Sequence, residues 1–151
     1  MIVYLAADHR GFSLKEELKK YLIGAGYEIE DVGAFEYNET DDYPDFAEKA
    51  ALGVAKDASN RGIMVCGSGM GMDVAANKVK GIRATLAYSK ESAAHARTND
   101  DINVITLAGD VLSPEEAKEI VSTFLETEFS GEERHVRRLK KIEDIESQNF
   151  K

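Results

Sequence analysis

Short runs of apolar residues alternate along the chain with longer segments in which apolar residues recur every three or four positions. The short runs have the length and composition of buried strands, and five strands are predicted, over residues 2–6, 27–32, 62–66, 83–87 and 104–108. The longer segments have helical spacing and predict helices over residues 13–25, 43–56, 70–79, 90–98, 114–125 and 134–146.

Two of the predicted helices carry a recognisable start signal. Ser13 and Glu16 have the spacing of a capping box, so a helix is expected to begin at Ser13. Ser113 and Glu116 repeat that spacing, with Pro114 at the first helical position. The helix that follows Ser113 is therefore the clearest in the chain.

Alternation of nearly apolar strands with amphipathic helices is typical of a parallel sheet covered on both faces. The predicted fold is α/β, a Rossmann-like three-layer α/β/α sandwich around a five-stranded parallel sheet with right-handed crossovers. A length of 151 residues suits one such unit, so residues 1–151 are expected to form a single domain. Ligands of such folds bind beyond the carboxyl ends of the strands, which directs attention to the loops after strands 1, 3 and 5.

Composition narrows the classes of partner. The formal net charge of -9 disfavours nucleic acids and anionic membranes, because both are bound through extended basic surfaces. The chain has one cysteine, Cys66, and therefore no internal disulfide. It shows neither a signal-peptide pattern nor an apolar stretch of membrane-spanning length, so the expected location is the cytoplasm.

The loop after the first strand reads Ala7-Asp8-His9-Arg10-Gly11 and gathers a carboxylate, an imidazole and a guanidinium. These groups suit the binding of an anion and of hydroxyl groups. An ordinary surface ion pair between Asp8 and Arg10 explains the same residues. The place of the segment at the carboxyl end of a strand favours the functional interpretation.

The third strand ends in Cys66-Gly67-Ser68-Gly69-Met70-Gly71, whose glycines allow backbone amides to turn toward an anion at the start of a helix. The loop lacks the third glycine of a dinucleotide fingerprint, the outer glycines of a serine-hydrolase elbow and a Walker lysine. A thiol beside a helix amino terminus is disposed to ionise and can serve as a base. A buried structural cysteine is the alternative.

Basic residues gather near the end of this acidic chain, with Arg134 and Arg138 one helical turn apart. Two guanidinium groups so placed suit a phosphate dianion. A solvated basic helix face accounts for the charges equally well.

Taken together, these segments resemble the ribose-5-phosphate isomerase B family, which includes the subunits of galactose-6-phosphate isomerase. The resemblance covers nearly the whole chain. It is carried by the two loops above together with Asp42-Tyr43-Pro44, Ala75-Ala76-Asn77-Lys78, Gly81-Ile82-Arg83-Ala84 and Arg134-His135 followed by Arg138.

The resemblance implies an aldose-ketose isomerase that interconverts ribose 5-phosphate and ribulose 5-phosphate, in the pentose phosphate pathway. Cys66 would move the proton between C2 and C1 through an enediolate, the loop amides with Ser68 would hold the oxyanion, and Asp8 would handle a hydroxyl. His9, Arg134 and Arg138 would bind the phosphate. The other implied substrate-binding residues are Arg10, Tyr43, Gly67, Gly69, Met70, Gly71 and Asn99.

The resemblance further implies no metal and no organic cofactor. It implies a homodimer, or a dimer of dimers, with the site built across the interface between two chains. The C-terminal helix of residues 134–146 is expected to contribute to the interface and to the site.

Two positions depart from the family pattern. Thr98 stands where the family has a histidine that opens the furanose ring, a catalytic position at which a threonine cannot exchange protons near neutral pH. Loss of such a group costs about a hundred- to ten-thousand-fold in the assisted step, which leaves His95, His135 or spontaneous ring opening as substitutes. Asp110 stands where ribose-5-phosphate isomerases carry a phosphate-binding arginine, and it would repel a phosphate.

These departures keep other functions open. One is an isomerase of a six-carbon sugar phosphate, such as galactose or allose 6-phosphate. Another is a non-catalytic sugar-phosphate-binding subunit, against which the retention of Cys66, Ser68 and Asp8 argues. A flavodoxin-like mononucleotide binder shares the sheet, but the chain has no tryptophan and few loop aromatics to stack on a ring.

Overall fold

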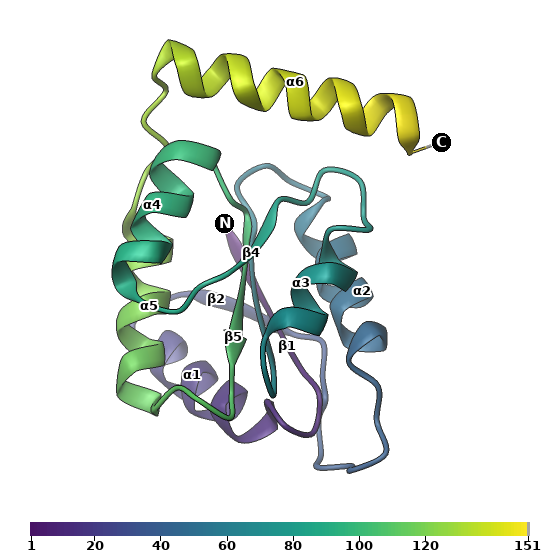
Figure 1. Cartoon of the computed structure of the whole chain (residues 1–151). Coiled ribbons are helices and arrows are strands. Elements are labelled where there is room, and N and C mark those ends of the chain that lie inside the picture. The colour runs from purple at the N-terminus through teal and green to yellow at the C-terminus, as the bar shows by residue number, and fades with distance from the viewer. Residues whose placement is uncertain (151) are drawn as a thin grey trace.

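The structure is a computed structural model that describes residues 1–150, and Lys151 lies outside the described residues. One parallel sheet runs through the molecule with the strand order β2-β1-β3-β5-β4 (Figure 1). Its strands are β1 (Ile2–Ala7), β2 (Glu28–Asp31), β3 (Arg61–Cys66), β4 (Ala84–Leu86) and β5 (Val104–Ala108). The predicted five-stranded parallel sheet is confirmed.

Helices cover both faces of the sheet and complete the predicted three layers (Figure 1). They are α1 (Phe12–Gly24), α2 (Tyr43–Val54), α3 (Met70–Ala76), α4 (Lys90–Asp100), α5 (Pro114–Glu126) and α6 (Glu133–Asn149). Helices α1, α4 and α5 pack on one face around Leu18, Leu107 and Phe124, all fully buried. Helices α2 and α3 pack on the other face around Met64 and Met72.

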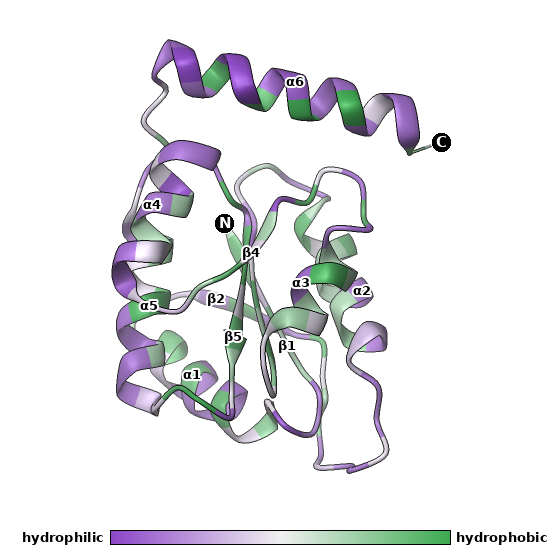
Figure 2. Cartoon of the chain, viewed as in Figure 1, coloured by the Kyte–Doolittle hydropathy of each residue, from purple (hydrophilic) through white to green (hydrophobic). Residues whose placement is uncertain are grey.

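The middle of the sheet is the most apolar part of the chain, because β1, β3 and β5 each have neighbours on both sides and helices above and below (Figure 2). Strand β2 differs from the prediction of nearly apolar strands. Its residues are acidic except for Ile29, which packs against the core. As an edge strand it is exposed along one side, so its alternate positions face water.

The predicted start of the first helix at Ser13 is wrong. Helix α1 begins at Phe12, its N-cap is Gly11, and no side chain caps it. A Cβ at Gly11 would lie 2.2 Å from the Val65 carbonyl oxygen, so the close passage of this turn over β3 fixes the start of the helix. The capping box of Ser113 and Glu116 is confirmed, with both reciprocal hydrogen bonds present.

Helix α6 lies across the end of the molecule at which the strands begin (Figure 1). His135 and Leu139 are its buried residues, and most of its remaining surface is hydrophilic (Figure 2). The backbone N–H of Ser130, just before α6, donates to the carbonyl of Thr98 at 3.0 Å, which ties the helix to the last turn of α4. Within residues 1–150, no helix is both long enough and apolar enough to cross a membrane.

Candidate active site

The carboxyl ends of β1, β3 and β5 bring three loops together at one edge of the sheet, as predicted for a parallel fold. Backbone hydrogen bonds join these loops. The N–H of Gly109 donates to the Cys66 carbonyl at 2.8 Å, and the N–H of Asp110 donates to the Gly67 carbonyl at 3.1 Å. The Asp8 N–H donates to the carbonyl of Val65 at 3.3 Å. Residues that are far apart in the sequence therefore form one continuous surface.

Cys66 occupies the centre of this edge. Its side chain is buried, and the backbone N–H of Gly69 donates to its Sγ atom at 3.1 Å. Gly69 adopts a left-handed conformation with φ +77°, which turns its amide back toward the strand end before α3 begins. Of the amides in this loop, the Gly69 amide is the one directed at the sulfur.

The rest of the glycine loop lies against two side chains from other loops. A Cβ at Gly67 would fall 2.2 Å from the Cζ atom of Arg10, and one at Gly71 would fall 2.7 Å from the ring of Tyr43. Arg10 and Tyr43 therefore border the loop, together with the exposed side chain of Met70. The Met70 N–H donates to the Oγ atom of Ser68 at 3.3 Å, and Ser68 is exposed.

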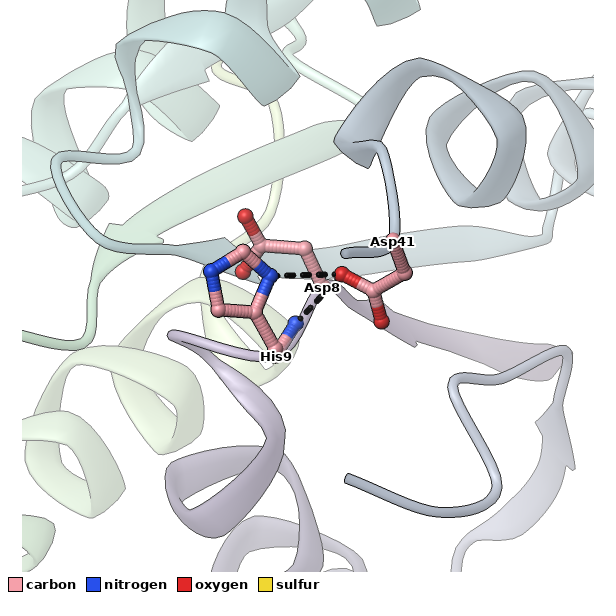
Figure 3. A group of neighbouring side chains, drawn as sticks. All are labelled: Asp8, His9 and Asp41. Atoms are coloured by element: carbon pink, nitrogen blue, oxygen red, sulfur yellow. Dashed lines mark hydrogen bonds and ion pairs between the residues drawn. The ribbon is translucent and has the colours of Figure 1, made fainter. Parts of the chain in front are cut away.

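Asp8 and His9 lie beside this loop, with Asp41 next to them (Figure 3). The Oδ1 atom of Asp8 accepts hydrogen bonds from the N–H groups of Arg10 and Gly11, both at 3.0 Å, which fixes the carboxylate at the turn. The Nδ1 atom of His9 lies 2.7 Å from the Oδ1 atom of Asp41. This hydrogen bond is the main reason that the pKa of His9 is raised above its ordinary value.

Arg10 forms an ion pair with Asp110 from the loop after β5. The alternative considered from the sequence, a pair between Arg10 and Asp8, is wrong, because Asp8 accepts only backbone N–H groups here. The hydrogen bond to Asp110 is also the main reason that the pKa of the Arg10 guanidinium is raised, and the charge of Cys66 acts on it in the same direction. Both members of the pair are largely exposed.

Four predicted site residues lie elsewhere in the chain: Thr98, Asn99, Arg134 and Arg138. Helix α4 runs back from the carboxyl edge for 11 residues, about 16 Å, so Thr98 and Asn99 fall near the opposite end of the sheet. Arg134 and Arg138 are exposed on α6 at that same end (Figure 1). One copy of the chain therefore does not bring these four residues together with Cys66.

The two histidines considered as substitutes for the missing one have different settings. Both ring nitrogens of His95 lie within 3.1 Å of the amide nitrogen of Asn99, and His95 is exposed. The imidazole of His135 is 4% exposed and its Nδ1 atom lies 2.9 Å from Ser130 Oγ. His95 is therefore the more accessible of the two.

A groove of about 820 Å³ lies between β4, α4 and α6, on the part of the surface that carries His95. Its lining includes Leu86, Tyr88, His95 and Ile142. Tyr88 is 75% exposed, which is unusual for a large aromatic side chain.

The group of Asp8, His9 and Asp41 is the one set of potential metal ligands found among residues 1–150, with ligand atoms within 4.8 Å of one another. One oxygen of each carboxylate already has partners, since Asp8 Oδ1 accepts two backbone N–H groups and Asp41 Oδ1 accepts from His9.

The sequence profile described as ribose/galactose isomerase matches residues 3–142. The chain belongs to this family. It is 40% identical to the ribose-5-phosphate isomerase B of Mycobacterium tuberculosis over 146 residues, which cover 97% of this chain and 90% of that protein.

Solved structures of family members superimpose closely. Ribose-5-phosphate isomerase B of Mycoplasma genitalium, with bound ribulose 5-phosphate, gives a TM-score of 0.94 at 38% identity, covering 98% of this chain and 97% of that one. The type B enzyme of Trypanosoma cruzi gives 0.93 at 41% identity, covering 99% and 100%. The family resemblance seen in the sequence is confirmed.

Asp41 is not among the site residues predicted from the sequence, because the fold class directs attention to the loops after strands 1, 3 and 5. The signal that could have identified Asp41 is the place of its loop in the parallel sheet. Strand β2 pairs in parallel with β1, so the loop after β2 reaches the same edge of the sheet as Asp8 and His9.

Proposed function

We propose that this protein is an aldose-ketose isomerase that interconverts ribose 5-phosphate and ribulose 5-phosphate. The observation that carries the proposal is the position of Cys66 at the carboxyl end of β3, next to the loop of Asp8, with the Gly69 amide directed at its sulfur. Family membership across residues 3–142 and the bound ribulose 5-phosphate of the Mycoplasma genitalium relative support the same reaction.

In the proposed mechanism the Cys66 thiolate removes the proton from C2 of the open-chain aldose. The electron pair moves into a C1–C2 double bond, and the aldehyde oxygen becomes an enediolate oxygen that the loop amides and Ser68 hold. The proton of the C2 hydroxyl then passes to the oxygen on C1 as the C2 carbonyl forms, and Cys66 returns its proton to C1. Asp8 binds a sugar hydroxyl, and the atoms balance without a redox cofactor.

The complete site is proposed to form between two copies of the chain, as a homodimer or a dimer of dimers. The support is that Thr98, Asn99, Arg134 and Arg138 lie on an exposed part of the surface that is separate from Cys66 (Figure 1). In this arrangement His9 from one chain and the two arginines from the other bind the phosphate. A working free thiol suits a reducing compartment, so a cytoplasmic location is part of the proposal.

A second candidate reaction is the isomerisation of a six-carbon sugar phosphate. Asp110 favours it, because this carboxylate engages Arg10 at the place where an arginine is expected in ribose-5-phosphate isomerases. A longer sugar would carry its phosphate farther from Cys66 and from this ion pair.

Initial rates with ribose 5-phosphate, galactose 6-phosphate and allose 6-phosphate distinguish the candidates. A kcat/KM at least tenfold higher for ribose 5-phosphate supports the first reaction, and the reverse order supports the second. Inactivity with all three contradicts the isomerase proposal. Light scattering of the purified protein gives the number of chains.

A further inference from the structure

The orientation of His9 is fixed by two hydrogen bonds to a single atom. The Oδ1 atom of Asp41 accepts from the backbone N–H of His9 at 2.9 Å and lies 2.7 Å from its Nδ1 atom. Because an ionised carboxylate only accepts hydrogen bonds, Nδ1 must carry the proton. The other ring nitrogen, Nε2, lies on the side of the ring away from Asp41 (Figure 3). It is therefore the nitrogen available to a ligand.

Asp41 is itself held in place by its loop. Its side chain is 9% exposed, and its N–H donates to the Asn38 carbonyl at 3.1 Å. The Asn38 side chain in turn accepts from the N–H and the hydroxyl of Thr40. The second carboxylate oxygen, Oδ2, is buried and has no hydrogen-bond partner among the described residues. Burial of a carboxylate is unfavourable unless the group is paired, which makes its contact with an imidazolium the more favourable.

Two negative groups and one positive group surround the His9 ring. The hydrogen bond to Asp41 raises the pKa of His9 most, partial burial lowers it, the charges of Asp8 and Asp41 raise it, and that of Arg10 lowers it. Tyr37 meets the ring edge-on, with the ring centres 6.2 Å apart. The net direction is upward, so His9 stays protonated to a higher pH than a free histidine does.

We propose that Asp41 is a positioning residue that orients His9 and keeps it cationic, so that His9 Nε2 donates to the phosphate of the substrate. The inference rests on the proposed function, because it takes the ligand of His9 to be the phosphate of a sugar. Asp41 itself touches neither the substrate nor the reacting carbons.

This role has a definite pH dependence. With Asp41 present, the imidazolium persists up to the raised pKa, and affinity for the phosphate falls as the pH rises through that value. Replacement by asparagine removes the charge and returns the pKa toward 6.5. At a pH above the His9 pKa of both the wild type and Asp41→Asn, the protonated fraction of His9 is about tenfold lower in the variant for each unit by which its pKa is lower. The loss of affinity should therefore be small at pH 6 and large at pH 8.

The first test needs no substrate. The chain has three histidines, His9, His95 and His135, so the ring signals of ¹⁵N-labelled protein can be assigned with a His9→Gln variant. In Asp41→Asn, we expect the pKa of His9 to fall and the preference for a proton on Nδ1 to weaken. Glu39→Gln is the matched control, because Glu39 is an exposed acidic residue of the same loop whose side chain makes no interaction found here.

The second test is kinetic. We expect Asp41→Asn to raise the KM for ribose 5-phosphate by a larger factor at pH 8 than at pH 6 while kcat changes less than threefold. Glu39→Gln should leave both constants unchanged at either pH. An unshifted His9 pKa in Asp41→Asn overturns the proposal, and so does a KM change that is the same at both pH values.

The two tests separate the failure of this proposal from the failure of the proposed function. If the wild type does not isomerise any sugar phosphate, the NMR titration is repeated with inorganic phosphate. Binding of phosphate that raises the His9 pKa in the wild type but not in Asp41→Asn supports the positioning role independently of turnover. Phosphate that leaves the His9 signals of the wild type unchanged overturns it.

Discussion

The ion pair between Lys15 and Asp31 anchors the start of the loop that carries Asp41. The Lys15 side chain is 1% exposed, and its Nζ atom lies 2.8 Å from both carboxylate oxygens of Asp31 and 2.8 Å from the Ala34 carbonyl. Asp31 also accepts from Lys19 Nζ at 2.7 Å and from the Gly33 N–H at 3.0 Å. The carboxylate thus holds two ammonium groups and the turn after β2.

Replacement of Asp31 by asparagine should cost about 3 kcal/mol of the free energy of unfolding. Removal of one partner from a buried ion pair costs about 3–5 kcal/mol, because the other charge stays buried. The lower end applies, since Lys15 keeps the Ala34 carbonyl and a contact to Glu16 at 3.0 Å. For a protein of this length the melting temperature should fall by about 6–12 °C.

The effect should vanish in acid. Burial raises the pKa of Asp31, but the hydrogen bonds from Lys15, Lys19 and Gly33 together outweigh burial and leave the pKa below its ordinary value of 3.8. Because the pKa of Asp31 is lower in the folded protein than in the unfolded chain, the carboxylate stabilises the fold fully above about pH 3.8. This stabilisation is lost as the pH falls through the pKa that Asp31 has in the folded protein. The difference in stability between wild type and Asp31→Asn should therefore shrink below that pH.

Urea denaturation followed by circular dichroism at pH 7 and at pH 3 measures both quantities. Glu30→Gln is the matched control, because Glu30 is an exposed residue of the same strand. The double variant Lys15→Met with Asp31→Asn should recover part of the loss, since no buried charge is left unpaired. A loss below about 1 kcal/mol at pH 7, or an equal loss at pH 3, would refute the reasoning.

Two further variants test the positions that depart from the family pattern. Asp110→Arg should lower the KM for ribose 5-phosphate several-fold, because it removes a carboxylate that repels phosphate and engages Arg10; an unchanged or higher KM would mean that the phosphate lies elsewhere. Thr98→His should raise kcat/KM by about a hundredfold or more where ring opening limits the rate, since it restores a general acid or base. An unchanged kcat/KM in Thr98→His would show that position 98 takes no part in the limiting step.

The sequence predicts the fold well wherever local pattern and burial agree. Strand β5 begins and ends at the predicted residues, because the apolar run 104–108 is flanked by polar residues on one side and by Gly109-Asp110 on the other. The capping box at Ser113 is also local and is formed. The same signal at Ser13 failed, because the close contact of Gly11 with Val65 depends on how two strands lie side by side.

The residues of the candidate site show the same difference between features set by the local sequence and features set by contacts between distant segments. Cys66, Asp8 and His9 are predictable because each lies at or just after the carboxyl end of a strand, where the fold class places ligand sites. The pairing of His9 with Asp41 is not, since it joins loops 32 positions apart through side chains. Arg10 faces Asp110 rather than Asp8 for a similar reason, because the backbone turn after β1 already occupies Asp8 Oδ1.

The central claim is that the Cys66 sulfur transfers the proton of the sugar. Proton NMR of ribose 5-phosphate with the purified protein in heavy water follows the C2 proton and the ketose product in the same sample. We expect the wild type to exchange the C2 proton and form ribulose 5-phosphate, and Cys66→Ala to do neither while it still binds the sugar phosphate. Continued exchange or turnover in Cys66→Ala would contradict the account.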